Sequence, residues 1–351
     1  MFPFIRPTMP EPSEWQHYLA PAYQHRRFTN FGPVHDMLER RITEQLCPPG
    51  RVAVLTSSGT AALTAALIAW DVRGKVLLPS FTFPATLQAV LQAQCEPVFC
   101  DVSPQTWEAG LEEVLPCLGR GVQAVIGVRS FGLCRDFSSL ARACSRYSIP
   151  LVLDSAAALG GTLAGGQRVG GQGAIEVFSL HATKVFGIGE GGVLFTAADQ
   201  ADRVKQTINF GIRGDTIASG FNGKLSEFAA AVGLAVLDRF DDFLSVRRAR
   251  SARYYEFFRD FPGCACASDP GDPPWQTFPV RLPEAIDAGD FVTRTREAGL
   301  ELRRYYRPAL NDDPVAKQLA NSMVCWPVYS DMSSEEQESI LTITRGLLDP
   351  A

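Results

Sequence analysis

VAVLTSSGTAALTAALIAW, residues 52–70, contains the transition that decides the fold. The apolar run at its start predicts a buried strand, and the apolar run that begins at Ala61 predicts a buried helix. Only small residues, from Thr56 to Thr60, lie between the two. A strand that passes directly into a helix is typical of α/β proteins, in which helices connect the strands of a mostly parallel sheet.

The same alternation continues along the chain. Further helical stretches are predicted at 85–93 and 138–147, each between two apolar strands. Strands that are apolar throughout are expected where helices cover both faces of a sheet. The predicted strands after the first are at 76–79, 97–102, 124–128 and 150–156.

A chain of 351 residues is longer than one hydrophobic core usually extends, so we expect two domains. A long helix is predicted at 228–258, and it becomes charged midway, as suits a passage between domains. A loop rich in proline and glycine follows at 267–279. We predict an N-terminal arm at 1–44, a large domain at 45–240 and a small α+β domain at 241–351.

The composition argues against several classes of partner. The formal net charge is −5 and no basic cluster contains aromatic residues, so we expect no nucleic-acid partner. No run approaches the ~18 apolar residues of a membrane helix, and prolines and acids occupy the N-terminus where a signal peptide would be apolar. Nine cysteines without a CxxC pair predict reduced thiols in a cytoplasmic protein and no metal site.

The residues between the first strand and helix are candidates for a phosphate site. The free N–H groups at a helix start favour an anion, and Gly59 lets a ligand approach the backbone closely. A simple serine or threonine cap on a buried helix explains the same residues equally well.

Asp154 ends an apolar strand in LVLDSAAALGG, residues 151–161. Ligands of parallel sheets bind at the carboxyl ends of the strands, where this carboxylate would lie. A cap for the following turn is the alternative interpretation.

FSLHATKVFGIGEGGVLF, residues 178–195, contains one of only five lysines among 33 basic residues, Lys184. Arginine supplies a permanent charge, but only lysine can act as an amine nucleophile. A lysine at the end of a buried strand is the simpler alternative. GIGEGG at 187–192 matches a dinucleotide motif, but an apolar strand follows it where that motif requires a helix.

One ligand requires all three features. Pyridoxal 5′-phosphate needs a phosphate site, an acid that keeps its pyridine nitrogen protonated, and a lysine for a Schiff base. The chain offers them in a coherent order, with Lys184 thirty residues (184 − 154) after Asp154.

The sequence also resembles the sugar aminotransferase family named after DegT/DnrJ/EryC1/StrS, within the fold-type I pyridoxal-phosphate enzymes. The resemblance implies a mostly parallel seven-stranded sheet in the large domain and a smaller C-terminal α+β domain. The matching segments are FTNFGP (28–33), SSGTAAL (57–63), PSFTFPATLQAVLQAQCEPVFCDVSPQTW (79–107), SFGLC (130–134), FSLHATKVFGIGEGG (178–192), NFG (209–211) and GFNGKLSEFAAAVGLAVL (220–237).

The resemblance assigns roles to several residues. Lys184 would be the Schiff-base lysine and Asp154 the partner of the pyridine nitrogen. Gly59 and Thr60 would bind the phosphate through their backbone amides, and Ser179 would add its hydroxyl.

Three further residues and the activity follow from the same resemblance. Phe83 would stack on the cofactor ring, and Asn222 and Lys224 would reach the cofactor of a second subunit, which implies a homodimer. The implied reaction moves an amino group from glutamate or glutamine to a keto sugar, most often nucleotide-linked, in deoxyamino-sugar biosynthesis.

Three positions depart from the family pattern. Ala157 replaces a glutamine or histidine that contacts the cofactor's phenolic oxygen in most members. Leu159 and Ile208 replace a frequent histidine and a frequent arginine. The departures leave two alternatives open: a dehydratase or lyase on the same scaffold, and a regulatory relative without catalysis.

Overall fold

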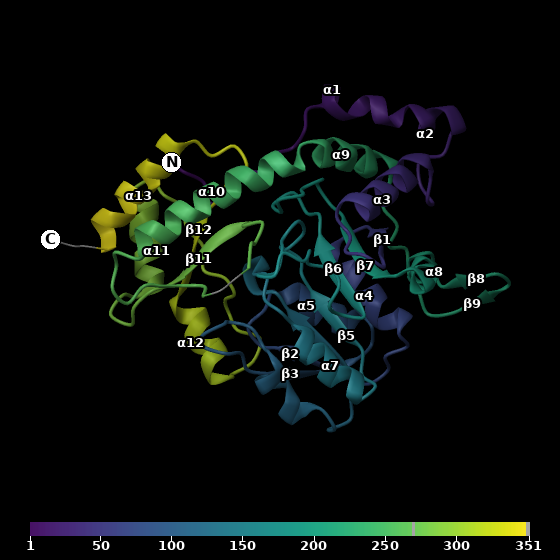
Figure 1. The fold of residues 1–351 in the computed structure, drawn as a ribbon, viewed down its shortest axis with the longest axis horizontal. Coiled ribbons are helices and arrows are strands. Elements are labelled where there is room, and N and C mark those ends of the chain that lie inside the picture. The colour runs from purple at the N-terminus through teal and green to yellow at the C-terminus, as the bar shows by residue number, and fades with distance from the viewer. Residues whose placement is uncertain (269–270, 349–351) are drawn as a thin grey trace.

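The structure is a computed structural model that describes residues 1–268 and 271–348. Its main feature is a seven-stranded sheet with the strand order β1-β7-β6-β5-β4-β2-β3 (Figure 1). Strand β7 runs antiparallel to both of its neighbours, and the remaining pairs are parallel, which confirms the predicted α/β class. The strands are β1 (Arg51–Thr56), β2 (Lys75–Pro79), β3 (Glu96–Cys100), β4 (Val122–Val128), β5 (Leu151–Asp154), β6 (Ile175–Ser179) and β7 (Gly192–Ala197).

Helices cover both faces of this sheet. In β1, Val54 packs into a core on one face, while its neighbours Ala53 and Leu55 pack into a core on the other. Both sides of the strand are therefore apolar, because successive side chains point to opposite faces. Helices α4 (Gly59–Ala69), α5 (Pro84–Gln92) and α8 (Ala198–Ile208) lie on the first face, and α3 (Pro33–Gln45), α7 (Ser138–Arg146) and α9 (Glu227–Asp238) lie on the second.

The long helix predicted at 228–258 is two helices, α9 and α10 (Phe240–Phe258). The break falls at Arg239, whose φ of −116° and ψ of 7° are not helical. Helix α9 and the first turns of α10 pack in a core of the large sheet, and α10 then runs toward the C-terminal part of the molecule (Figure 1). The single-helix prediction was wrong because the periodicity of the apolar residues does not register this change of direction.

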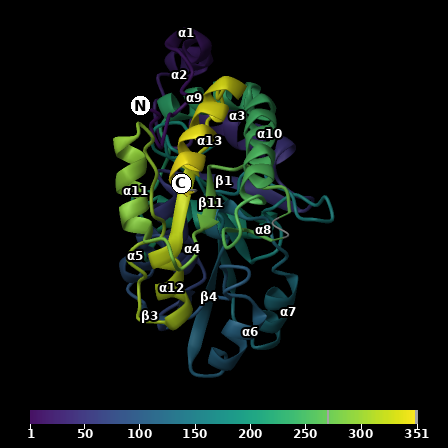
Figure 2. The ribbon, with the colours of Figure 1, turned by 90° about the vertical axis from the view of Figure 1, so that its left-hand side faces the viewer.

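The C-terminal part is built around a second, antiparallel sheet with the order β10-β11-β12. Figure 2 shows helix α13 and the helices beside it on this part of the molecule. One apolar cluster joins the two sheets, since it contains both Phe81 near β2 and Trp326 in β12. We keep the division into an arm, a large domain and a small domain as a proposal. The elements are β10 (Ala265–Cys266), β11 (Thr277–Arg281), α11 (Ala288–Glu297), α12 (Pro314–Ser322), β12 (Met323–Pro327) and α13 (Ser334–Leu348).

The first residues of the chain lie against this C-terminal part. The Phe2 N–H donates to the carbonyl of Gly299 at 2.8 Å, and Phe4 is buried in the shared core. Arg6 pairs with Asp331 and Glu336. The helices α1 (Pro12–Trp15), η1 (Gln16–Leu19) and α2 (Ala20–His25) follow and lead back to the large sheet. No helix in the described ranges is long and apolar enough to cross a membrane.

A buried carboxylate fixes the start of α3. Glu227 accepts hydrogen bonds from the amides of Val34 at 2.7 Å and His35 at 3.1 Å. A Cβ on Gly32, just before the helix, would lie 2.7 Å from the carboxyl carbon of Glu227. The segment before α3 is thus held directly on the first turn of α9.

We expect Glu227→Ala to lower the free energy of unfolding by about 2–3 kcal/mol, because two buried amides lose their acceptor. Glu227→Gln, which keeps one acceptor oxygen, should cost less. Urea unfolding followed by circular dichroism checks both values. An alanine variant with the parental midpoint would show that these hydrogen bonds do not stabilise the fold.

Candidate active site

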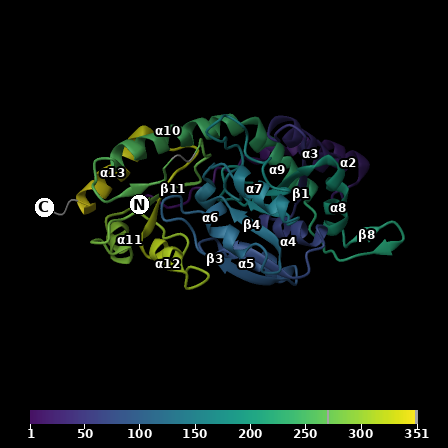
Figure 3. The ribbon, with the colours of Figure 1, turned by 60° about the horizontal axis from the view of Figure 1, so that its bottom comes forward.

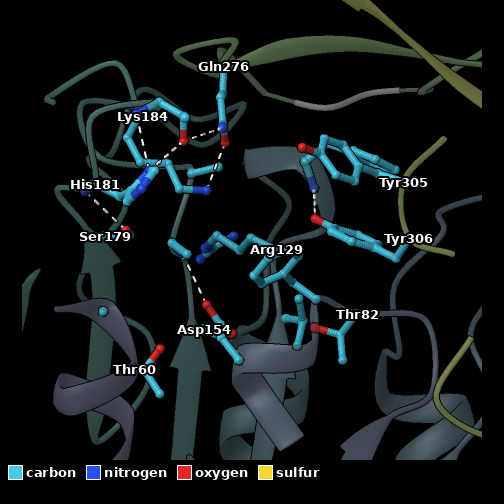
Figure 4. Close-up of a pocket in the computed structure, with 18 of the residues that line it drawn as sticks. Thr60, Thr82, Arg129, Asp154, Ser179, His181, Lys184, Gln276, Tyr305 and Tyr306 are labelled. Atoms are coloured by element: carbon cyan, nitrogen blue, oxygen red, sulfur yellow. Dashed lines mark hydrogen bonds between the residues drawn. The ribbon is translucent and has the colours of Figure 1, made fainter. Parts of the chain in front are cut away.

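A cavity of about 430 Å³ opens at the carboxyl ends of the parallel strands (Figure 4). Its floor comes from the start of α4 and from the ends of β4 and β5. The loop after β6 forms one wall, and Gln276, Tyr305 and Tyr306 of the C-terminal part form another. Ile5 of the N-terminal segment also lines the cavity. The site therefore lies between the two sheets.

The start of α4 presents backbone amides to this cavity. The Ser58 hydroxyl caps the helix by accepting from the amide of Ala61 at 3.1 Å, so the cap interpretation of this serine also holds. The capping leaves the first two amides of the helix, those of Gly59 and Thr60, for another acceptor. Both residues line the cavity, together with Ser179. This arrangement suits the phosphate of a ligand.

Two glycines make room for this arrangement. A Cβ on Gly59 would lie 3.0 Å from the Cβ of Ser179, so a larger residue would separate the two halves of the anion site. A Cβ on Gly192, at the start of β7, would lie 2.4 Å from the carbonyl oxygen of Ser58. Gly192 thus lets β7 pass close to the start of α4.

Asp154 is the last residue of β5, and its side chain is buried. One carboxylate oxygen accepts from the Thr86 hydroxyl at 2.7 Å, and the other accepts from the amide of Ala156 at 3.2 Å. The Thr86 hydroxyl lies 2.8 Å from that of Thr82. Burial raises the pKa of Asp154, and the hydrogen bonds from Thr86 and Ala156 and the charge of Lys184 oppose that rise.

Lys184 follows β6, and its half-buried side chain lines the same cavity. Its Nζ donates to the side-chain oxygen of Gln276 at 2.8 Å (Figure 4). Burial lowers the pKa of Lys184 from 10.5 to about 8, and the carboxylate of Asp154 opposes that shift. About a tenth of the amine is therefore neutral, and so nucleophilic, at pH 7, far more than for an ordinary lysine.

The side chains of Phe83 and His181 also line the cavity. The ring of Phe83 is half exposed and is available to cover a flat ligand. The Nδ1 of His181 lies 2.9 Å from the Thr183 hydroxyl, and its Nε2 lies 3.6 Å from Glu190. Phe81, by contrast, is fully buried beneath Tyr306 and belongs to the core.

The structure brings six of the eight predicted site residues together and leaves two outside the cavity lining. Asn222 forms an isolated antiparallel β-bridge with Asn209. The Lys224 Nζ lies 4.4 Å from the centre of the Phe210 ring. Gly223 between them accepts from the Ser57 amide at 2.7 Å, so this segment passes just behind the anion site. The six that line the cavity are Gly59, Thr60, Phe83, Asp154, Ser179 and Lys184.

The three departures from the family pattern lie in different surroundings. Ala157 lines the cavity and offers no side-chain hydrogen bond. Leu159 and Ile208 are buried in two apolar cores and are not among the cavity-lining residues. Arg129 also lines the cavity, but it donates to Glu176 at 2.7 Å and to Gln172 at 2.8 Å. These hydrogen bonds hold the Arg129 guanidinium on Glu176 and Gln172, so the arginine does not replace the hydrogen-bonding group that is missing at Ala157.

Gln276 contacts Lys184 and Thr86 contacts Asp154, two contacts that the sequence did not predict, and Tyr306 lies in the same cavity wall. Thr86 lies in a segment that matches the family, but nothing in the sequence links it to Asp154. Gln276 lies in the Pro/Gly-rich loop predicted at 267–279. The Tyr306 hydroxyl accepts from the Phe131 amide at 3.0 Å, and the two rings stack at 4.9 Å.

The donor set fits pyridoxal phosphate. Free amides and a hydroxyl suit its phosphate, a buried carboxylate suits a protonated ring nitrogen, and a half-buried lysine with a lowered pKa suits its aldehyde. Together with the mostly parallel sheet, these groups define the fold and site of the pyridoxal-phosphate-dependent aminotransferases.

Comparison with known proteins gives the family. The sequence pattern of the DegT/DnrJ/EryC1/StrS aminotransferase family matches residues 11–345, and the chain belongs to this family. It is 28% identical to the dTDP-4-amino-4,6-dideoxy-D-glucose transaminase of Shigella dysenteriae over 97% of this chain and 98% of that enzyme. The crystal structure of DesI in the presence of its TDP-sugar product superposes with a TM-score of 0.91 at 29% identity, covering 98% of this chain and 92% of DesI.

A shorter match reaches higher identity. The chain is 37% identical to the protein Rv3402c of Mycobacterium tuberculosis over 257 residues, which are 70% of this chain. The match spans 62% of the length of that relative.

We expect the amine of Lys184 in the cofactor-free protein to be acylated with a pH midpoint near 8, because only the neutral amine reacts. Asp154→Asn should move the midpoint lower still, since the carboxylate favours the protonated form. Peptide mass spectrometry after brief acylation at a series of pH values measures both. The exposed Lys317 reports the state of the reagent in every sample. A Lys184 midpoint near 10.5 would contradict the burial of the amine.

Proposed function

We propose that this protein is a pyridoxal-phosphate-dependent aminotransferase that moves an amino group from glutamate or glutamine to a nucleotide-linked keto sugar. The observation that carries the proposal is the shared cavity of Lys184, Asp154 and the start of α4. The names of the relatives support the sugar, since they include dTDP-4-amino-4,6-dideoxy-D-glucose transaminases and a GDP-perosamine synthase. The product class is then a deoxyamino sugar.

Each side chain of the cavity has a separate role toward the cofactor in this proposal. Pyridoxal phosphate, when bound, supplies an electron sink for bonds to the substrate carbon that carries nitrogen. The amides of Gly59 and Thr60 and the Ser179 hydroxyl bind its phosphate, and Asp154 keeps a proton on its ring nitrogen. Lys184 would be the nucleophile toward its aldehyde, and its amine would be the group that accepts and returns a proton.

The mouth of the cavity suits an anionic substrate. Arg303 and Tyr305 lie there with Ile5, and the Arg303 guanidinium is half exposed. A permanent cation next to aromatic and apolar surface fits a sugar joined to a phosphate group. We propose that the acceptor enters from this side.

We also propose a cytoplasmic homodimer in which Asn222 and Lys224 complete the site of the other subunit. The Lys224 Nζ is a buried atom without a hydrogen-bond partner among the described residues, which supports a partner from outside the chain. The hairpin of β8 (Ile212–Arg213) and β9 (Thr216–Ile217) projects from the body of the molecule close to this segment (Figure 3). Exposed Phe210, Ile212 and Ile217 give it an apolar surface.

The nine cysteines are free thiols, which supports a reducing compartment.

The decisive experiment is the first half of the reaction. The parental protein loaded with pyridoxal phosphate should convert it to pyridoxamine phosphate when glutamate or glutamine is added, as followed by absorbance. Lys184→Arg keeps the charge but cannot act as the nucleophile, so we expect a loss of about 10³-fold or more.

Two outcomes would contradict the proposal. A Lys184→Arg protein with the parental rate would remove the lysine from the chemistry. A parental protein that binds the cofactor but converts it with neither donor would favour the dehydratase or lyase alternative, for which Ala157 leaves room.

Mixed dimers test the shared site. Lys184→Ala and Lys224→Ala homodimers should each be inactive or nearly so. After the two are unfolded and refolded together, a mixed dimer has one site with both lysines, so activity should return to about one quarter of the parental value. Activity that stays at the level of the separate variants would show that each chain builds its own site.

A further inference from the structure

Gln276 contacts the amine of Lys184 from a distant part of the chain. It lies just before β11, whereas Lys184 follows β6 in the large sheet. The Gln276 side-chain oxygen accepts from the lysine Nζ at 2.8 Å, and its amide nitrogen lies 3.4 Å from the Thr183 hydroxyl. One side chain thus contacts two successive residues of the loop that carries the lysine.

The backbone of Gln276 is itself fixed by a buried arginine. Arg247 of α10 donates through Nη1 to the carbonyls of Trp275 at 2.9 Å, Gln276 at 3.4 Å and Val328 at 2.7 Å. Its Nε donates to the Ser330 hydroxyl at 2.8 Å. The side chain is buried, and each of these acceptors is a neutral group. Burial lowers the pKa of Arg247 to about 10.

The buried guanidinium of Arg247 thus holds the backbone of the loop that carries Gln276. A guanidinium has five N–H donors in a rigid fork, so it can fix several carbonyls at once. The cost of burying it is offset only if those hydrogen bonds are all made. The peptide that carries Gln276 is therefore one of the firmly held places in the wall of the cavity.

We propose that Gln276 is a positioning residue for Lys184, holding its unattached amine at a defined place in the cavity that Asp154 also lines. A lysine side chain has four flexible carbons, so an amine without a partner would sample many positions. The amide oxygen of glutamine accepts from both the neutral amine and the ammonium form. It can therefore hold the amine before and after a proton is taken up.

The same hydrogen bond changes the proton affinity of the amine. A bond from an ammonium group is stronger than one from a neutral amine, so Gln276 favours the protonated form. Burial acts in the opposite direction. Replacing Gln276 by an apolar residue should therefore lower the pKa of Lys184 further, and replacing it by a carboxylate should raise it.

The test compares acylation of Lys184 against pH in cofactor-free full-length protein. Gln276→Leu should lower the pH midpoint by roughly 0.5–1 unit, since a charge-assisted bond is lost. Gln276→Glu should raise it by about one unit or more, because a carboxylate then faces the amine. Gln318→Leu, an exposed site on α12, is the matched control and should leave the midpoint unchanged.

Opposite shifts in the two Gln276 variants support the proposal. Midpoints equal to the parental value in both, or shifts of the same sign, overturn it. If Gln276→Leu does not fold by circular dichroism, the shift in Gln276→Glu decides alone.

A second readout connects the contact to catalysis, and this part rests on the proposed function. Gln276→Leu should lower the rate constant of the donor half-reaction by about 10-fold with little change in the half-saturating donor concentration, because the lysine and not the donor is displaced. An unchanged rate constant would overturn the catalytic part of the proposal. If the parental protein reacts with no donor, the proposed function fails, but the acylation profiles still decide whether Gln276 positions the amine.

Discussion

Lys184 and Asp154 place an amine and a buried carboxylate in one cavity, and the surrounding side chains are arranged to hold both. Neither charge is stable in a protein interior without hydrogen bonds or a partner charge. Asp154 receives them from Thr86 and from the amide of Ala156, and Lys184 receives one from Gln276. These contacts come from a helix, a turn and the segment that leads into the second sheet, so the carboxylate and the amine require several parts of the chain to meet.

The basic residues divide between two tasks that follow from their chemistry. Of the 33 basic residues, 28 (33 − 5) are arginines. Buried Arg129 bonds Glu176, which also accepts from Ser155 at 2.6 Å beside Asp154, and buried Arg247 fixes the loop of Gln276. These two permanent cations hold the structure around the cavity, whereas Lys184 carries a charge that can be removed near neutral pH.

The sequence predicted the parts of the site that depend on strand ends. Asp154 and the start of α4 could be placed because the carboxyl ends of parallel strands meet at one edge of a sheet. Thr86 and Gln276 could not, since their contacts join residues 68 and 92 positions apart and depend on how the elements pack. The same limit explains Leu159 and Ile208, which replace polar residues of the family pattern and lie in apolar cores. Asn222 and Lys224 stay predictions, because one chain does not contain the site they would complete.

We propose that Lys184 is the residue that reacts with the cofactor. Identifying the lysine to which pyridoxal phosphate becomes covalently attached is the direct test. The parental protein is incubated with pyridoxal phosphate, reduced with borohydride, digested and analysed by mass spectrometry. With five lysines in the chain, each candidate falls in a distinct part of the sequence. We expect the added mass on the peptide that contains Lys184. A label on Lys224, or one spread over exposed lysines with Lys184 unmodified, would contradict it.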